Sequence, residues 1–349
     1  MPDHTLYMRR CIELAQFGLG NVSPNPMVGS VIVCEDRIIG EGYHQKYGEA
    51  HAEVNAINNV LSNHINGIEL LKKSTIYVSL EPCAHFGKTP PCSDLIIQYQ
   101  IPIVVIGCRD PFELVDGKGL EKLRQAGISI IENVLRNECL ELNKRFFTRI
   151  QKKRPYIILK WAQTADGFFA PLDGTKRWIT SEASKQLVHK WRSEEDAVLI
   201  GKNTALIDNP QLNVRDWLGR NPKRMVIDRN LTLPKSLHLF DQSEETFIFN
   251  SQKSFYDGNL KYLELEDFDN LLPQLILYQL YLMDIQSIIV EGGVKTIELF
   301  LKSGLWDEAR IFTSLDKWEE GNKAPFISGK LDSEQIIGLD NLKTYRLNS

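Results

Sequence analysis

The chain has 349 residues, of which 43% are hydrophobic and 25% charged, and its formal net charge is -4. This length allows two cores of ordinary domain size, and the composition is that of a globular protein. The net negative charge gives no sign of the positively charged surface that nucleic-acid binding requires. The longest apolar run, 275–283, is too short to span a bilayer. We therefore expect a cytoplasmic protein that acts on small molecules, with neither nucleic acid nor a membrane as partner.

The first part of the chain alternates predicted helices and strands. Apolar residues recur at helical spacing from Met8 to Leu19, and a stretch rich in glycine and proline, 18–26, follows them. Two apolar runs joined by a short polar turn predict a β-hairpin over 28–43. The later elements are predicted as a helix over 51–61, a strand over 74–80, a helix over 92–99, a strand over 101–108, a helix over 120–127 and a strand over 128–132.

A second series begins after a basic cluster and a proline, so we place a domain boundary close to Gln151, between domains 1–150 and 151–349. Its elements are predicted as strands over 156–161, 196–201, 224–228, 246–249 and 287–293 and helices over 181–192, 271–283 and 296–303. Alternation of this kind is typical of α/β domains, in which helices cover both faces of a partly parallel sheet.

Four polar residues of the first domain fall where a metal centre could form. His51 and Glu53 begin a predicted helix, Cys83 follows a strand and Cys92 begins the next helix. A catalytic zinc ion takes three protein ligands and leaves a position for water, and Glu53 could accept the proton of that water. Zinc nucleobase deaminases carry H-x-E and P-C-x-x-C. Here eight residues separate the two cysteines, which lengthens the loop without removing a ligand.

Each of these residues alone has an ordinary structural explanation. His51 could cap its helix, Glu53 could be solvated, and both cysteines could be buried. A purely structural zinc site is a further alternative, in which His85 would be the fourth ligand. Two other functional classes also stay open: a nucleobase or tRNA deaminase with a degenerate second domain, and a non-catalytic zinc-binding module. The remaining cysteines lie among apolar neighbours and are expected to be buried bystanders: Cys11, Cys34, Cys108 and Cys139.

The second domain lacks the common nucleotide-binding fingerprints. Neither G-x-G-x-x-G after a strand nor G-x-x-x-x-G-K-[ST] occurs in the sequence. The turn Glu291-Gly292-Gly293 between a predicted strand and helix could bring backbone N–H groups close to a phosphate. A plain tight connection is the alternative explanation of this turn.

Several segments together resemble the riboflavin-biosynthesis deaminase–reductase family. They are SPNPMVGSVIV, GYH before HAE, EPCAHFGKTPPC, DGKGLEKLRQAGI, LKWAQTADG, RWIT, DAVLIGKNTALIDNPQLNVR and VEGG, so the likeness extends over nearly the whole chain. The resemblance implies a three-layer αβα cytidine-deaminase-like domain followed by an α/β dihydrofolate-reductase-like domain. We also expect a homo-oligomer.

The resemblance implies two successive reactions on phosphorylated pyrimidines. 2,5-Diamino-6-(5-phosphoribosylamino)pyrimidin-4(3H)-one would lose an amino group as ammonia, and NADPH would then reduce the ribosyl group of 5-amino-6-(5-phosphoribosylamino)uracil to ribityl. In the deaminase, His51, Cys83 and Cys92 would bind Zn²⁺ and Glu53 would transfer protons. The positions implied for its substrate are Asn25, His44, His85 and Lys88.

In the reductase, the resemblance implies two groups of residues. The positions implied for NADPH are Ala162, Trp178, Thr204, Asp208, Gly292 and Gly293, with Arg229 near the 2′-phosphate. The positions implied for the ribose-phosphate substrate are Lys176, Arg192, Leu212, Arg215 and Glu291. Lys176 stands where the family usually has a small hydroxyl residue.

Overall fold

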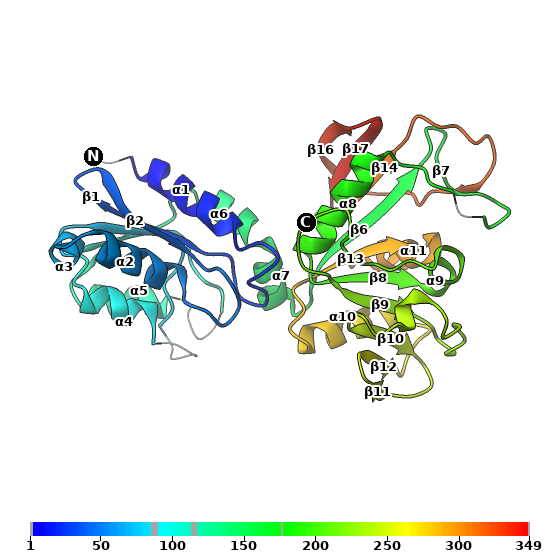
Figure 1. The fold of residues 1–349 in the computed structure, drawn as a ribbon, viewed down its shortest axis with the longest axis horizontal. Coiled ribbons are helices and arrows are strands. Elements are labelled where there is room, and N and C mark those ends of the chain that lie inside the picture. The colour runs from blue at the N-terminus through cyan, green and yellow to red at the C-terminus, as the bar shows by residue number, and fades with distance from the viewer. Residues whose placement is uncertain (1–2, 85–89, 113–116, 176, 348–349) are drawn as a thin grey trace. The chain divides into compact units, whose positions relative to one another are not determined.

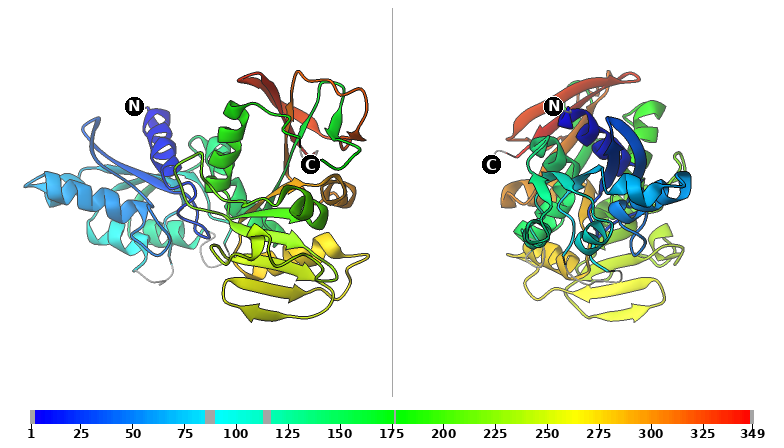
Figure 2. Two further views of the ribbon diagram at one scale, coloured as in Figure 1. Left: turned by 45° about the vertical axis from the view of Figure 1, so that its right-hand side comes forward. Right: turned by 90° about the vertical axis from the view of Figure 1, so that its left-hand side faces the viewer.

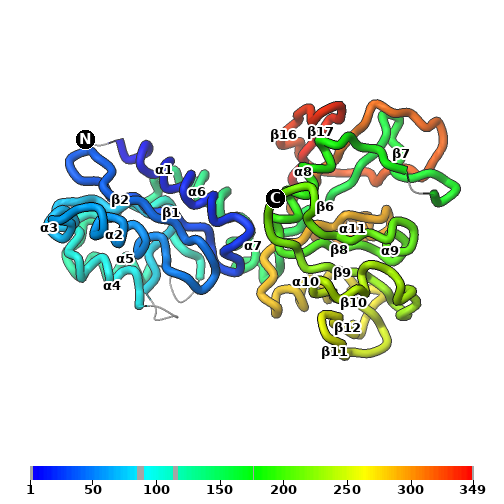
Figure 3. The backbone as a smooth tube through the Cα atoms, in the orientation of Figure 1, coloured from blue at the N-terminus to red at the C-terminus, as the bar shows by residue number. Residues whose placement is uncertain are grey.

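The computed structural model describes residues 3–84, 90–112, 117–175 and 177–347. The chain packs as two compact units, Met1–Lys152 and Lys153–Ser349, and Figure 3 traces the backbone of each. Among the described residues, no helix is both long and apolar enough to cross a membrane. The units are described separately below.

The first unit is built on one five-stranded sheet in the order β2-β1-β3-β4-β5. Its strands are β1 (Gly29–Cys34), β2 (Arg37–Tyr43), β3 (Thr75–Leu80), β4 (Ile103–Cys108) and β5 (Ser129–Ile131). The predicted hairpin is confirmed, because β1 pairs antiparallel with β2 across a turn in which Glu35 and Asp36 have φ of 49° and 59°. The chain then runs parallel through β3, β4 and β5.

Helices cover both faces of this sheet (Figure 1). Alternate strand residues separate the two cores: Ile76 and Val78 pack in one cluster, and Tyr77 packs in the other. The first cluster takes side chains from α2 (Ala52–Asn63), α3 (Gly67–Leu71), α4 (Cys92–Gln98) and α5 (Lys118–Gln125). The second takes them from α1 (His4–Gln16), α6 (Arg136–Leu142) and α7 (Lys144–Lys152). The unit is therefore the expected three-layer αβα domain.

The first helix ends earlier than its apolar spacing predicted. Asp3 caps α1 by accepting a hydrogen bond from the Thr5 backbone N–H, and the last helical residue is Gln16. The expectation that Leu19 belongs to the helix is wrong. Leu19 instead packs outside α1 against a small cluster that contains Val22 and Met27, so its burial arises from the loop and not from helical periodicity.

The second unit contains a ten-stranded sheet in the order β11-β12-β10-β9-β8-β13-β6-β14-β17-β16. Its strands are β6 (Tyr156–Gln163), β8 (Ala197–Gly201), β9 (Lys223–Ile227), β10 (Thr246–Asn250), β11 (Phe255–Asp257), β12 (Leu260–Glu264), β13 (Ser287–Gly292), β14 (Glu308–Thr313), β16 (Lys330–Ile337) and β17 (Asp340–Arg346). Neighbouring strands from β12 to β14 are parallel, and antiparallel strands flank them at both ends (Figure 2).

Helices lie on both faces of this sheet too. One core joins the strands to α8 (Glu182–Glu194), α9 (Lys202–Asp208) and the short 3-10 helix His238–Phe240. The other joins them to α10 (Leu272–Leu282) and α11 (Val294–Ser303). A separate two-stranded ribbon pairs β7 (Phe168–Ala170) with β15 (Asn322–Lys323). Because β6, β13, β8 and β9 are adjacent and parallel, their carboxyl ends meet at one edge, where α/β sheets bind ligands.

Candidate active sites

The first unit brings three potential metal ligands together. His51 is the N-cap of α2, Cys83 follows β3, and Cys92 is the first residue of α4. The His51 Nδ1 atom lies 3.6 Å from Cys83 Sγ and 3.3 Å from Cys92 Sγ, and all three atoms lie within 4.8 Å of one another. A tetrahedral zinc site has nitrogen-to-sulfur and sulfur-to-sulfur edges of about 3.6 and 3.8 Å. The three residues therefore fit a zinc ion.

The start of α4 stabilises negative charge on Cys83. The Cys92 backbone N–H donates to Cys83 Sγ at 3.3 Å, and helix N-termini favour thiolates. A hydrogen bond from the Cys92 thiol and a second from His51 lower the pKa of Cys83 to about 4. The same bond between the thiols raises the pKa of Cys92, since Cys92 is its donor. These contacts thus favour the thiolate form of Cys83, which suits a cation.

Glu53 is a buried carboxyl group beside these ligands. It lies in the first turn of α2 and is 3% exposed. Burial raises the pKa of Glu53 to about 7, although the neighbouring His51 acts in the opposite direction. A carboxyl group with a pKa near neutrality can both accept and donate a proton. The alternative of a solvated Glu53 is therefore wrong.

Asn25 and His44 lie next to the three ligands. The His44 Nδ1 atom is 3.1 Å from the Ala50 carbonyl, which can only accept, so Nδ1 carries the proton. The other ring nitrogen, Nε2, therefore accepts from Asn25 Nδ2 at 3.1 Å. Burial lowers the pKa of His44, and its ring centroid is 5.5 Å from that of His51. Two polar residues with fixed orientation thus border the centre.

Three of the residues implied for substrate binding, His85, Lys88 and Lys176, lie outside the described residues. The four cysteines expected to be bystanders, Cys11, Cys34, Cys108 and Cys139, are all buried, as predicted.

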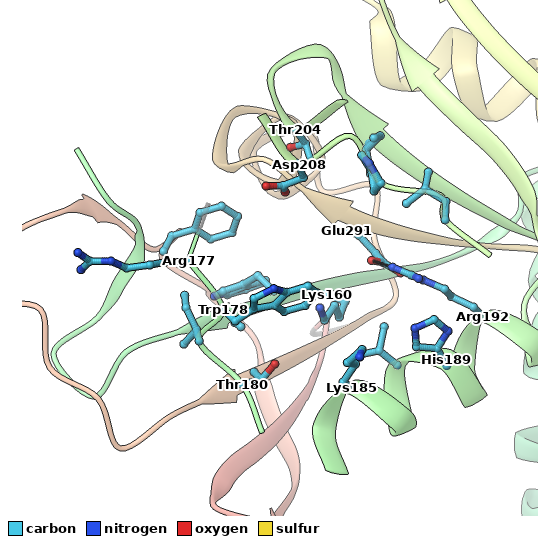
Figure 4. Close-up of a pocket in the computed structure, with 18 of the residues that line it drawn as sticks. Lys160, Arg177, Trp178, Thr180, Lys185, His189, Arg192, Thr204, Asp208 and Glu291 are labelled. Atoms are coloured by element: carbon cyan, nitrogen blue, oxygen red, sulfur yellow. Dashed lines mark hydrogen bonds and ion pairs between the residues drawn. The ribbon is translucent and has the colours of Figure 1, made fainter. Parts of the chain in front are cut away.

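In the second unit, a cavity of about 220 Å³ opens near the carboxyl ends of β6 and β13. Figure 4 shows α8 on one side of it and Thr204 and Asp208 on the opposite side. We call it the first cavity. It gathers most of the residues implied for the reductase: Ala162, Trp178, Arg192, Thr204, Asp208, Leu212, Arg215 and Glu291. Trp178 is 63% exposed, so it is a wall of this cavity and not part of a core.

Arg192 and Glu291 form a two-pronged ion pair at the base of this cavity. The Arg192 Nε and Nη2 atoms donate to the two carboxylate oxygens at 2.7 and 2.6 Å (Figure 4). Burial alone would raise the pKa of Glu291, but Arg192 holds it at about 2. Arg215, by contrast, is partly exposed and lies 4.0 Å from Asp216. The two arginines implied for the ribose-phosphate substrate therefore differ in how their charge is balanced. The Glu291 carboxylate neutralises Arg192 but not Arg215.

Sequence reasoning missed several residues of this cavity. Lys185 and His189, which were not predicted, project from the same face of α8 as the predicted Arg192 (Figure 4), and the spacing of four and three residues along the helix could have revealed that face. His189 Nδ1 accepts from the Arg215 backbone N–H at 3.2 Å, which ties the segment after Leu212 to α8. Lys160 also lines the cavity, from a part of β6 in which its neighbours Leu159 and Trp161 are apolar. A lysine among the apolar residues of a predicted buried strand could have indicated a functional role.

A second cavity of about 680 Å³ adjoins the first, with which it shares Phe169, Arg177, Thr204 and Asp208. Gly293 and Arg229 line it, as do Lys202 at the start of α9 and Lys295 at the start of α11. A Cβ atom on Gly293 would lie 3.2 Å from the Thr204 hydroxyl oxygen, so glycine allows this close approach. Gly292 ends β13 beside the second cavity but is not one of the residues that line either cavity.

Arg229 already has a partner in this structure. Its guanidinium donates to the two carboxylate oxygens of Asp269 at 2.5 and 2.8 Å, at an exposed position. An exposed pair of this kind contributes little stability, so a stronger anion could displace Asp269. The wall of the second cavity thus combines cationic side chains with two helix N-termini, an arrangement suited to phosphate groups.

Comparison with known proteins agrees with the division of the chain into two units that carry different sites. Residues 1–108 match the family model "Cytidine and deoxycytidylate deaminase zinc-binding region", and residues 155–346 match "RibD C-terminal domain". The riboflavin biosynthesis protein RibD of Aquifex aeolicus is 42% identical over 90% of this chain and 88% of its own length. The RibD of Actinobacillus pleuropneumoniae is 38% identical over 97% of this chain and 94% of its own length.

A solved structure is similar over both units. It is a diaminohydroxyphosphoribosylaminopyrimidine deaminase/5-amino-6-(5-phosphoribosylamino)uracil reductase from Thermotoga maritima, with a TM-score of 0.90, 38% identity and coverage of 99% of both chains. The fold and the two sites define a bifunctional enzyme that joins a deaminase of the zinc-binding cytidine-deaminase class to a reductase. The chain belongs to the riboflavin biosynthesis protein RibD family.

Proposed function

We propose that the chain catalyses two successive steps of riboflavin biosynthesis on the substrates named for the Thermotoga maritima protein. The first is hydrolytic deamination of 2,5-diamino-6-(5-phosphoribosylamino)pyrimidin-4(3H)-one, and the second is reduction of the ribosyl group of 5-amino-6-(5-phosphoribosylamino)uracil to ribityl. The observation that carries this proposal is the convergence of His51, Cys83 and Cys92 beside the buried carboxyl group of Glu53. The deaminase would occupy residues 1–150 and the reductase residues 151–349.

His51, Cys83 and Cys92 would hold the zinc ion of the deaminase. The bound ion would supply a nucleophile at neutral pH by lowering the pKa of water from its value in bulk. Among the described residues three side chains could bind the ion, which would leave one position for water, as in catalytic zinc sites. His85, the residue considered as a fourth ligand, lies outside the described residues.

Glu53 would move the protons of the reaction. Its carboxylate would accept a proton from the attacking water, deliver it to a ring nitrogen of the pyrimidine, and then protonate the departing amine. Burial beside His51 keeps bulk water away from this carboxyl group. Asn25 and His44 would bind the pyrimidine, and their mutual hydrogen bond orients both side chains. His85 and Lys88 remain predicted contacts of the substrate.

NADPH would bind in the second cavity and reach into the first. The positive ends of α9 and α11, with Lys202, Lys295 and Arg229, suit its phosphate groups. The shared residues Thr204 and Asp208 would stand where its nicotinamide end meets the substrate. The other implied contacts of the cofactor are Ala162, Trp178, Gly292 and Gly293. When bound, NADPH would supply the hydride.

The first cavity would hold the ribose-phosphate substrate of the reductase. Arg215 is a partly exposed cation there, and Arg192 and Glu291 would form the base of the site. Leu212 is buried beside them, and Lys176 remains a predicted contact. These residues would bind and orient the substrate, because hydride transfer depends on alignment of the two reactants more than on a protein nucleophile.

One pair of assays on the same preparation tests this proposal. Release of ammonia from the diaminopyrimidine measures the first activity, and oxidation of NADPH with the deaminated intermediate measures the second. We expect both activities from this chain. Ammonia release without NADPH oxidation would instead favour a single-activity deaminase with a degenerate reductase domain. A cytoplasmic location and a homo-oligomeric state remain predictions, and light scattering of the purified chain would measure the latter.

A further inference from the structure

A buried carboxylate stands beside the proposed zinc ligands without being one of them. Glu81 is 4% exposed and lies between the end of β3 and the loop that carries Cys83. Its carboxylate accepts hydrogen bonds from the backbone N–H groups of Gly117 at 3.1 Å, Gly119 at 3.2 Å and Leu120 at 3.4 Å. These groups belong to the start of α5, where backbone donors lack helical partners and negative charge is favoured.

The first turn of α5 also touches the backbone just before Cys83. A Cβ atom on Gly119 would lie 2.1 Å from the carbonyl oxygen of Pro82, which is closer than real Cβ atoms come. Gly119 lies inside a regular helix, so the close approach, and not an unusual φ, is what requires glycine here. The first turn of α5 therefore packs directly against the peptide bond between Pro82 and Cys83. Gly119 lies in DGKGLEKLRQAGI, one of the segments on which the family resemblance rests, but the resemblance implied no role for it.

The start of α4 holds Cys83 from another direction. The Ser93 backbone N–H donates to the Cys83 carbonyl at 3.2 Å, and the Cys92 backbone N–H donates to its sulfur at 3.3 Å. An ion pair between Lys122 of α5 and Asp94 of α4 connects the two helices. The backbone on both sides of Cys83 is therefore fixed by helix N-termini.

We propose that Glu81, with Gly119, positions Cys83 for the metal. The carboxylate anchors the chain two residues before Cys83 to α5, and Gly119 lets α5 press on the intervening peptide. Together they set the direction in which the Cys83 side chain leaves the backbone. This inference rests on the proposed zinc centre. Glu81 is thus a positioning residue, and its loss weakens metal binding even where the fold is retained, as outer partners of metal ligands do.

A helix cap that served stability alone would behave differently. Loss of a cap lowers the free energy of unfolding but leaves the rate of metal release from the folded protein unchanged. The informative measurement is therefore the rate at which the folded full-length protein transfers zinc to a chromophoric chelator. The visible spectrum of the cobalt(II)-substituted protein provides a second readout, because it reports the geometry of the metal ligands.

The test compares Glu81→Gln and Gly119→Ala with a matched control, Glu121→Gln. Glu121 also lies in the first turn of α5, but it is exposed. We expect both test variants to release zinc about 10- to 100-fold faster than the wild type and to alter the cobalt spectrum. The control should match the wild type in both respects. NADPH oxidation by the same preparations should stay unchanged, because the reductase lies in the other unit.

The outcomes separate this inference from the function on which it rests. Wild-type protein that binds no zinc would overturn the zinc centre itself. Wild-type protein that binds zinc, together with test variants that release it at the wild-type rate, would overturn only the role of Glu81 and Gly119. If Glu81→Gln fails to fold, Gly119→Ala decides the matter, since it removes no hydrogen-bonding side chain.

Discussion

The ion pair between Arg192 and Glu291 predicts how the second unit responds to loss of one charge. Glu291 has a pKa of about 2 in place of the ordinary 4.5, and each pKa unit corresponds to about 1.4 kcal/mol, so the shift amounts to roughly 3 kcal/mol. Because the folded-state pKa is depressed, this contribution is complete above pH 4.5 and disappears as the pH falls toward 2. Glu291→Gln should therefore lower the free energy of unfolding at pH 7 by about 3 kcal/mol, because it leaves Arg192 buried without its counter-charge.

Tryptophan fluorescence can follow this change in the full chain. All 6 tryptophans lie in the second unit, beyond Lys160, so urea unfolding monitored by fluorescence reports on that unit. The difference between Glu291→Gln and the wild type should shrink below pH 4.5, because the Glu291 carboxyl group of the unfolded wild-type chain then binds a proton that the folded chain does not yet bind. The double variant Arg192→Met/Glu291→Leu should recover most of the stability. A loss well under about 1 kcal/mol at pH 7, or one that does not change in acid, would refute this reasoning.

Further predictions concern the two reactions and their pH dependence. Arg192→Ala should slow NADPH oxidation and leave ammonia release unchanged; an equal loss of both would contradict separate sites. Arg229→Ala should reduce the preference for NADPH over NADH by about tenfold in kcat/KM, and a wild type that prefers NADH would refute the role of Arg229. Burial, with Arg192 and Arg215, lowers the pKa of His189 to about 4. As the pH drops, His189 is protonated in the unfolded chain before it is protonated in the folded one. The free energy of unfolding should therefore fall between pH 6.5 and pH 4. Unfolding monitored by fluorescence should show that the free energy of unfolding of His189→Asn falls less than that of the wild type over this pH range. Removal of zinc with a chelator should stop ammonia release alone.

The sequence predicted the elements that carry a clear apolar period. The hairpin over 28–43 and most of the buried strands of both units were found, because continuous or alternating apolar residues face a core on one or both sides. The buried strand β14 was missed. Seven strands of the second unit were not predicted. β16 is exposed at nearly every position and β15 and β7 are very short, so pairing with a neighbour, and not burial, makes them strands.

Candidate sites were predictable to different degrees. His51, Glu53 and Cys83 occur at starts and ends of predicted elements, and parallel topology brings such positions together. The pairing of Arg192 with Glu291 joins residues 99 positions apart, and no local pattern indicates it. Glu81 was missed for the same reason, because its partners are backbone N–H groups of a helix that begins far along the chain. The roles of all these residues remain predictions.

Glu53→Gln tests the account of the deaminase most directly. The substitution keeps the shape of the side chain but removes the group proposed to accept and return the proton. Zinc content per chain and ammonia release from the diaminopyrimidine should be measured on the same preparation, with NADPH oxidation as evidence of an intact reductase. We expect stoichiometric zinc, unchanged NADPH oxidation and no ammonia release. Full ammonia release by this variant would contradict the proposed mechanism.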